Sequence, residues 1–285
     1  MRHQAHATGL ALHGKCGMAY RYRYVEQLKI PPAGRMISGS AAHRGGELDM
    51  EQLWATGGLL TDEELEDYVA TDFSERWEWA NEVDIQGNEG PDPRGFYLDR
   101  ALRLARLRHE KLAPDLAPLG WEDGAAVEVP FSLRLKDADM ELVGTIDLMT
   151  EGRAAESYVI RDGKNQAKSP AADDADKSLQ LTVYSIAGVS LFEKAPEKLC
   201  LDVAVDLKSG PKMKTLDTWR DPADSARMIA RRVQRLQTVI ETGAYAPADP
   251  SAWWCSKAWC GYWDRCPFAQ RPVSIGFAGP ETGGE

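Results

Sequence analysis

The stretch ELVGTIDLMTEGRAAESYVIRDGK (residues 141–164) contains two apolar segments that each carry an aspartate. We expect Asp147 to end one strand and Asp162 to end the next, and neighbouring strands lie about 4.8 Å apart. Two carboxylates at that spacing can share a divalent ion, and magnesium and manganese prefer oxygen ligands. Lys164 follows Asp162 by two residues, so both side chains project to one face of an extended segment. The alternative is a hairpin end that carries solvated charges.

Elements of alternating type surround this stretch. Residues 126–135 alternate between apolar and polar as a strand does, and they predict a hairpin with residues 141–149. Thr61-Asp-Glu-Glu64 is a capping box that opens a helix to about Ala80. Asp221-Pro222 is an N-cap with proline in the first turn, and Gly243 is the expected C-cap. Further helices are expected over residues 8–26, from about Ser38 or Ser40 through His43 and Glu47, and over 176–193. Another helix is expected to follow the loop at residues 87–95 and to end at about Leu112. Further strands are expected over 157–160 and 199–207.

This order predicts an α/β fold with a small mixed central sheet flanked by helices. We expect a single domain over residues 1–285, which suits the chain length. The core of the fold would occupy about residues 125–208, and an α-helical insertion about residues 60–115.

The helix after Asp162 and Lys164 carries Gln180 and Tyr184 at positions i and i+4, which share one helical face. Taken alone, such a pair is typical of a helix surface, and His43 alone is typical of an ordinary helix histidine. Their order along the chain gives them meaning. A histidine on an early helix, then G-x-x-D, D-x-K and Q-x-x-x-Y, resembles the RecB-like exonucleases of the PD-(D/E)XK superfamily, whose core resembles that of restriction endonucleases.

The resemblance implies roles for these residues. His43, Asp147, Asp162 and the backbone carbonyl of Gly163 would ligate Mg²⁺ or Mn²⁺, with Glu128 in support. Lys164 would be catalytic together with the two aspartates, while Gln180 and Tyr184 would position the site and the DNA. The chain departs from the family pattern at Gly163 and Asn165, where an aromatic residue and a threonine are usual, and Gly163 is expected to make the strand end more flexible.

The chain has five cysteines, of which Cys255, Cys260 and Cys266 lie within twelve residues. Their spacing lacks the C-x2-C pairs typical of zinc sites, and the odd number argues against a disulfide framework. With Cys16 as fourth ligand, they resemble AddB-type and CRISPR-associated nucleases, in which four cysteines hold a [4Fe-4S] cluster. The resemblance implies an iron–sulfur module that joins residues 250–270 to Cys16; zinc or no metal remain alternatives. Six aromatic residues are expected to shield it from water: Trp253, Trp254, Trp259, Tyr262, Trp263 and Phe268.

Cys200 alternates with apolar positions in a predicted strand and is interpreted as a small core residue.

The formal net charge of −10 argues against a coat-like nucleic-acid binder but is compatible with an enzyme that gathers carboxylates around metal ions. Arg227, Arg231 and Arg235 form a stripe on one helix, either a solvated face or a track for DNA phosphates. The segment Tyr20–Tyr24 is a second candidate contact.

No apolar run reaches the roughly 20 residues of a membrane span, and the first residues lack a signal-peptide core, so a cytoplasmic location and no membrane partner are expected. The expected activity is hydrolysis of phosphodiester bonds by an exonuclease on linear, preferably single-stranded DNA, in recombination, repair or phage DNA processing. Recombination or replication proteins are expected partners. The alternatives are a structure-specific endonuclease and a non-catalytic iron–sulfur DNA-binding subunit.

Overall fold

The computed structural model describes residues 4–85, 87, 89–135, 139–207 and 209–269. The chain divides into two compact units, which are described separately. Unit 1 comprises Met1–Ala11 and Pro31–Gly243, and unit 2 comprises Leu12–Ile30 and Ala244–Glu285. None of the helices in the described ranges combines the length and apolar character needed to cross a bilayer.

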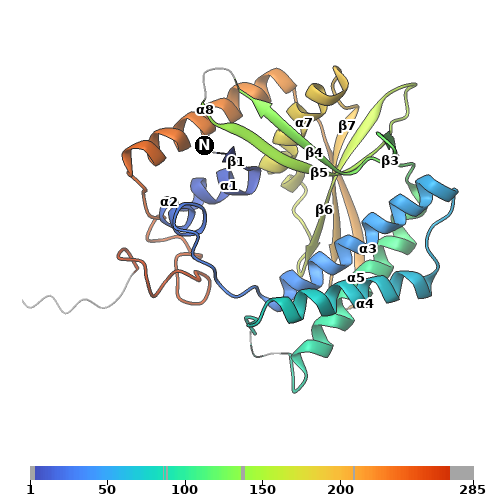
Figure 1. The fold of residues 1–285 in the computed structure, drawn as a ribbon, viewed down its shortest axis with the longest axis horizontal. Coiled ribbons are helices and arrows are strands. Elements are labelled where there is room, and N and C mark those ends of the chain that lie inside the picture. Colours follow the sequence, from blue (N-terminus) through green and yellow to red (C-terminus); the bar gives the residue numbers. More distant parts are fainter. Residues whose placement is uncertain (1–3, 86, 88, 136–138, 208, 270–285) are drawn as a thin grey trace, which may run out of the picture. The chain divides into compact units, whose positions relative to one another are not determined.

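Unit 1 is built around a six-stranded mixed sheet (Figure 1). Its central strand β5 pairs with β4 and β6 in antiparallel fashion and with the short β1 in parallel. β6 continues the sheet in parallel with β7, and β8 pairs antiparallel with β7 at the edge. The strands are β1 (Gln4–Ala5), β4 (Val127–Arg134), β5 (Glu141–Glu151), β6 (Tyr158–Gln166), β7 (Lys198–Val205) and β8 (Lys212–Thr218), and a separate hairpin joins β2 (Gly120–Trp121) to β3 (Gly124–Ala125).

Helices cover both faces of this sheet. Three of them, α3 (Gly34–Thr56), α4 (Asp62–Trp79) and α5 (Pro93–Lys111), pack together around Leu65, Phe73 and Leu104 on one face. On the other face α7 (Leu179–Phe192) contacts β4, β6 and β7, and α8 (Pro222–Thr242) packs on α7 (Figure 1). The mixed α/β fold predicted from the sequence is therefore confirmed, whereas the single domain stays a prediction. The shorter elements of unit 1 are η2 (Ala113–Asp115) and α6 (Asp174–Lys177).

Most expected elements are present, with four differences. The helix expected over residues 8–26 breaks at Cys16 into α1 (Ala7–Lys15), α2 (Gly17–Tyr20) and the π-helical η1 (Arg21–Val25), because Cys16 is an extended N-cap residue. α3 begins at Gly34, before the expected serines. The helix expected over 176–193 is interrupted at Ser178, which caps α7. β8 was not predicted, and the expected turn at residues 136–139 lies mostly outside the described residues.

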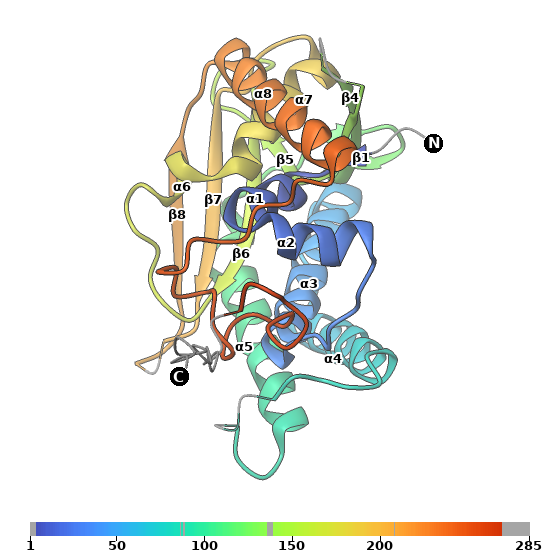
Figure 2. The same ribbon diagram turned by 90° about the vertical axis from the view of Figure 1, so that its left-hand side faces the viewer.

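Unit 2 joins two segments that are far apart in the sequence. The chain after α8 runs beside α2, where Met18 N donates a hydrogen bond of 3.2 Å to Ala246 O (Figure 2). Gly17 permits this approach, because a Cβ there would lie 2.8 Å from Ala246 O. The small core of the unit contains Met18, Tyr22 and Tyr262.

Candidate active site

The two aspartates lie where β5 and β6 separate. The antiparallel pairing of these strands runs from Glu151↔Tyr158 to Leu148↔Arg161 and stops there. Asp147 and Asp162 are the next residue on each strand, so their carboxylates lie at the fork. Both are inside their strands, since β5 begins at Glu141 and β6 continues to Gln166. The expectation that each aspartate ends its strand is wrong, because β6 leaves β5 at this point and continues its pairing with β7 instead.

A chain of hydrogen bonds connects the lysine to both aspartates. Lys164 Nζ donates to Asp162 Oδ1 over 2.7 Å and to Gln180 Oε1 over 3.0 Å. Gln180 Nε2 lies 2.6 Å from Tyr184 Oη, and the Tyr184 hydroxyl donates to Asp147 Oδ1 over 2.8 Å. Strands β5 and β6 and one face of α7 therefore fix the relative positions of these five side chains.

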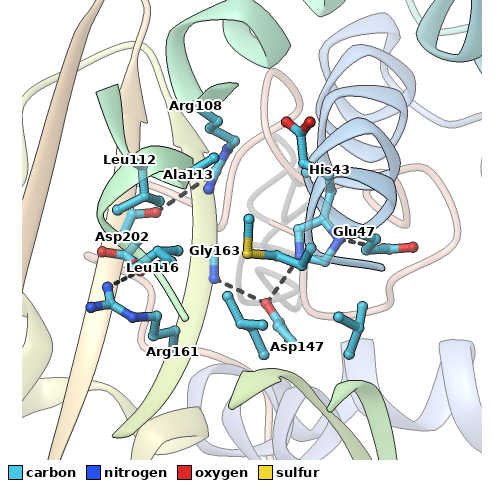
Figure 3. Close-up of a pocket in the computed structure, with 15 residues that line it drawn as sticks. His43, Glu47, Arg108, Leu112, Ala113, Leu116, Asp147, Arg161, Gly163 and Asp202 are labelled. Atoms are coloured by element: carbon cyan, nitrogen blue, oxygen red, sulfur yellow. Dashed lines mark hydrogen bonds and ion pairs between the residues drawn. The ribbon is translucent and has the colours of Figure 1, made fainter. Parts of the chain in front are cut away.

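His43 approaches Asp147 from α3 (Figure 3). Its Nε2 lies 3.1 Å from Asp147 Oδ2, which also accepts a hydrogen bond of 3.0 Å from Gly163 N. On its other side, His43 Nδ1 lies 2.7 Å from Glu47 Oε1, one helical turn along α3. A carboxylate behind a histidine fixes the ring orientation, an arrangement common around metal-binding histidines.

The fork concentrates negative charge in a poorly solvated place. Burial and the charge of Asp147 raise the pKa of Asp162 to about 7. Burial opposes ionisation of Asp147 too, but its bonds to His43 and the nearby Lys164 hold its pKa well below the usual range. Burial disfavours the charged form of His43, yet hydrogen bonds to Asp147 and Glu47 outweigh this and raise its pKa to about 9. Without a bound ion, protons on His43 and Asp162 neutralise part of this charge.

Two observations show that the side chains fit a divalent metal. Asp162 is fully buried, and its Oδ2 has no hydrogen-bond partner within the described part of the chain. A buried carboxylate oxygen without a partner is costly, so a missing ligand is a natural explanation. His43, Glu128 and Asp147 also offer three ligand atoms that lie within 4.8 Å of one another. Nitrogen and carboxylate oxygen ligands of this kind suit Mg²⁺ or Mn²⁺.

Glu128 reaches this group through an unusual backbone conformation. It lies on β4 between the residues that pair with Leu148 and Ile146, with a φ of +49°. The left-handed region is disfavoured for a residue with a side chain and tends to be retained at functional sites. Burial and repulsion from Asp147 raise the pKa of Glu128 to about 7. From the sequence, Glu128 was expected only to support the metal ligands, because nothing in the strand pattern indicates its strained backbone.

Arg108 of α5 is a second feature that the sequence did not indicate. Its buried guanidinium donates through Nη2 to Lys164 O over 2.8 Å and to Asp202 O over 3.3 Å. A Cβ at Gly163 would lie 3.2 Å from Arg108 Nη1 and 3.3 Å from His43 Cδ2. Gly163 was expected at a strand end, which it would make more flexible. It lies instead inside β6, where it pairs with Asp202 of β7. It makes room for Arg108 and His43. These residues line a cavity of about 60 Å³, space for about two water molecules (Figure 3).

Comparison with known proteins agrees with this geometry. Residues 7–267 match the sequence profile of the PD-(D/E)XK nuclease superfamily. The chain belongs to the PD-(D/E)XK nuclease superfamily. Membership makes it a phosphodiester hydrolase of a group that uses divalent metals.

One solved structure shows the same fold, and a second is reported beside it. A "putative exonuclease" from Eubacterium rectale is similar with a TM-score of 0.56 at 12% identity, over 95% of this chain and 91% of that one. The structure of SSO0001 is similar with a TM-score of 0.40 at 14% identity, over 95% of this chain and 89% of that one. No curated protein matches the chain.

Unit 2 of this nuclease brings four of the five cysteines to one pocket. Cys16, Cys255, Cys260 and Cys266 all line it. Burial raises the pKa of Cys260, a hydrogen bond from the backbone of Tyr262 lowers it, and the other three thiols raise it. Within the described residues, however, no three cysteine sulfurs lie within 4.8 Å of one another. The fifth, Cys200, is fully buried in β7 and 3.2 Å from Asp217 Oδ1.

The aromatic residues of this unit do not all shield the pocket, contrary to expectation. Tyr262, Trp263 and Phe268 line it, whereas Trp253, Trp254 and Trp259 are not among its lining residues and are exposed. In the candidate DNA-contact segment Tyr20–Tyr24, Tyr20 and Tyr22 are buried, whereas Arg21 and Arg23 are exposed, so the contact stays a prediction.

The arginine stripe of α8 in unit 1 is exposed. Ile229, Val233 and Leu236 are buried on the opposite face of the helix. Arg227 forms an ion pair with Asp224. Both interpretations of the stripe therefore stay open. The stripe consists of Arg227, Arg231 and Arg235.

Proposed function

We propose that the protein is a divalent-metal-dependent deoxyribonuclease that degrades linear, preferably single-stranded DNA from an end, in recombination, repair or phage DNA processing. The observation that carries this proposal is the hydrogen-bonded chain from Lys164 through Gln180 and Tyr184 to Asp147, beside the unpartnered buried oxygen of Asp162.

Each residue has a distinct task in this proposal. Asp147, Asp162 and His43 would hold the ion, with Glu128 and the carbonyl of Gly163 as further ligands. The ion would supply Lewis-acid activation of the phosphate and lower the pKa of a water molecule. Lys164 would stabilise negative charge that develops on the phosphate oxygens. Gln180 and Tyr184 would keep Lys164 and Asp147 in place, and Glu47 would hold the ring of His43.

The test is digestion of end-labelled single- and double-stranded DNA with manganese, with and without EDTA. Lys164→Met should abolish cleavage, whereas Lys168→Met, a matched change at an exposed lysine nearby, should not. Normal cleavage by purified Lys164→Met would falsify the proposed site. Absence of metal-dependent cleavage in the wild-type protein would favour the non-catalytic DNA-binding subunit.

The exonuclease proposal has its own test. A linear oligonucleotide is compared with the same sequence as a closed single-stranded circle, in manganese at low salt. The circle should resist cleavage, because it offers no end. Equal rates would favour a structure-specific endonuclease.

We further propose that Cys16, Cys255, Cys260 and Cys266 hold a [4Fe-4S] cluster in unit 2. The proposal is supported by the pocket that the four cysteines share, since four cysteine thiolates are the ligand set that a [4Fe-4S] cluster requires.

The cluster is tested by colour and metal content. The protein purified without oxygen should be brown with about four irons per chain. Cys255→Ser should bleach it, and Cys200→Ser, a matched change at a cysteine outside the pocket, should not. A colourless protein with one tightly bound zinc would contradict the cluster.

A further inference from the structure

Unit 2 exposes three tryptophans close together, which we call the tryptophan patch: Trp253, Trp254 and Trp259. Their exposed fractions are 66%, 37% and 54%. Tryptophan is highly buried on average, and adjoining exposed apolar side chains usually mark an interaction site. None of the three is used by the active site proposed above.

The rings of the patch are arranged edge to face. Those of Trp253 and Trp254 lie 5.7 Å apart at 83°, and those of Trp253 and Trp259 lie 5.1 Å apart at 87°. In an edge-to-face pair the edge of one ring meets the face of the other, and the exposed fractions show that each side chain stays partly accessible to solvent. A flat aromatic ligand could stack on the accessible part of a ring.

Unit 2 is basic although the whole chain is acidic. The described residues 12–30 and 244–269 contain six lysines and arginines against three aspartates and glutamates, while the whole chain has a net charge of −10. All six cations are exposed, and Lys257 lies between Trp254 and Trp259 in the sequence. This charge complements a polyanion. The six are Lys15, Arg21, Arg23, Lys29, Lys257 and Arg265.

We propose that the tryptophan patch is a stacking platform for the unpaired bases of single-stranded DNA, and that the cations of unit 2 hold its phosphates. Exposed aromatic side chains within a basic unit are the combination that binds single strands without reading their sequence. Paired bases in a duplex already stack on one another, so the platform selects unpaired nucleotides. The inference rests on the proposed nuclease function and names how its substrate is held.

The test is binding of a fluorescent oligothymidylate, followed by anisotropy at low salt in EDTA. Trp253→Ala and Trp259→Ala should each weaken binding about fivefold or more, as expected for the loss of one stacked base. Trp79→Ala and Trp219→Ala are matched controls in unit 1, where these tryptophans are 80% and 60% exposed, and they should bind as the wild type does. Trp259→Phe should retain most of the affinity.

A second ligand separates stacking from charge attraction. An abasic strand of equal length carries the same phosphates but no bases, so the wild type should bind it more weakly than oligothymidylate. In Trp253→Ala this preference should shrink. Equal binding of both strands by the wild type would overturn the platform, as would unchanged oligothymidylate binding by both alanine variants, which would leave the patch for a protein partner.

The outcome is independent of the proposed chemistry. EDTA removes the metal that cleavage needs, so a protein without nuclease activity whose alanine variants lose affinity still supports the platform. An active nuclease whose variants bind normally refutes the platform alone. Thermal melting of each variant verifies that it is folded.

Discussion

Replacing Asp162 by asparagine should stabilise the metal-free protein. Asp162 is fully buried at the fork of β5 and β6, and its pKa is raised to about 7 by burial and by the charge of Asp147. In an unfolded chain an aspartate has a pKa of about 3.9. An acid whose pKa is raised by folding costs stability as the pH rises from the unfolded value through the folded one.

The magnitude follows from these two values. At pH 8 both states of the wild type are ionised, and the difference corresponds to about 4 kcal/mol. At pH 5 the folded carboxyl is protonated while the unfolded one is largely ionised, and only on the order of 1 kcal/mol remains. Asparagine is always neutral and nearly isosteric, so Asp162→Asn should gain up to these amounts in free energy of unfolding.

Urea denaturation in EDTA at pH 8 and pH 5 measures both gains. Asp176→Asn is a control at a carboxylate for which no such gain is expected, since it accepts a hydrogen bond from Thr218. Manganese should then stabilise the wild type, by about 2.7 kcal/mol at a hundred times its Kd, and the variant much less. A variant that is less stable than the wild type at pH 8, or whose gain is independent of pH, would refute the reasoning.

Three further predictions concern the site. Gly163→Ala should weaken manganese binding, measured by calorimetry, with little loss of thermal stability. The reason is that the added Cβ would lie 3.2 Å from Arg108 Nη1 and 3.3 Å from His43 Cδ2. Unchanged manganese affinity would contradict this account of the glycine. Between about pH 7 and pH 9, manganese affinity should rise roughly tenfold per pH unit, because the ion must displace the proton that His43 holds in the metal-free protein; calorimetry in buffers of different ionisation enthalpy should detect its release. Tyr184→Phe should lower kcat about 100-fold while the protein stays folded, and a kcat equal to that of the wild type would remove Tyr184 from the site.

The sequence predicted the parts of the fold that depend on local patterns. The alternating strands β4 and β5, the capping box at Thr61 and the proline-led start of α8 all lie close to where periodicity and capping place them. β8 was missed because its residues, KMKTLDT, show little apolar alternation, and its pairing with β7 sets its conformation instead. The extent of β6 was also missed, because the polar run after Asp162 resembles a turn unless the parallel partner is known.

Part of the candidate site could also be predicted from the sequence, and part of it could not. His43, Asp147, Asp162, Lys164 and the pair on α7 follow from motif order, and the contacts between them agree with it. Arg108 could not be found in this way, since it lies on a helix of ordinary amphipathic pattern and approaches β6 only through tertiary packing. Glu47 did carry a signal, its i+4 spacing from His43, which sequence reasoning did not use.

The division of unit 2 between two distant segments has a consequence for how the protein is made. Cys255 emerges from the ribosome 239 residues after Cys16. At about 5 to 20 residues per second, that interval is roughly 10 to 50 s. Throughout it, Met18 and Tyr22 lack the partners that bury them, and the Cys16 thiol is open to oxidants and stray metals. The first strands and helices of unit 1 can form in the meantime, so the earliest part of the chain to be synthesised is among the last to mature.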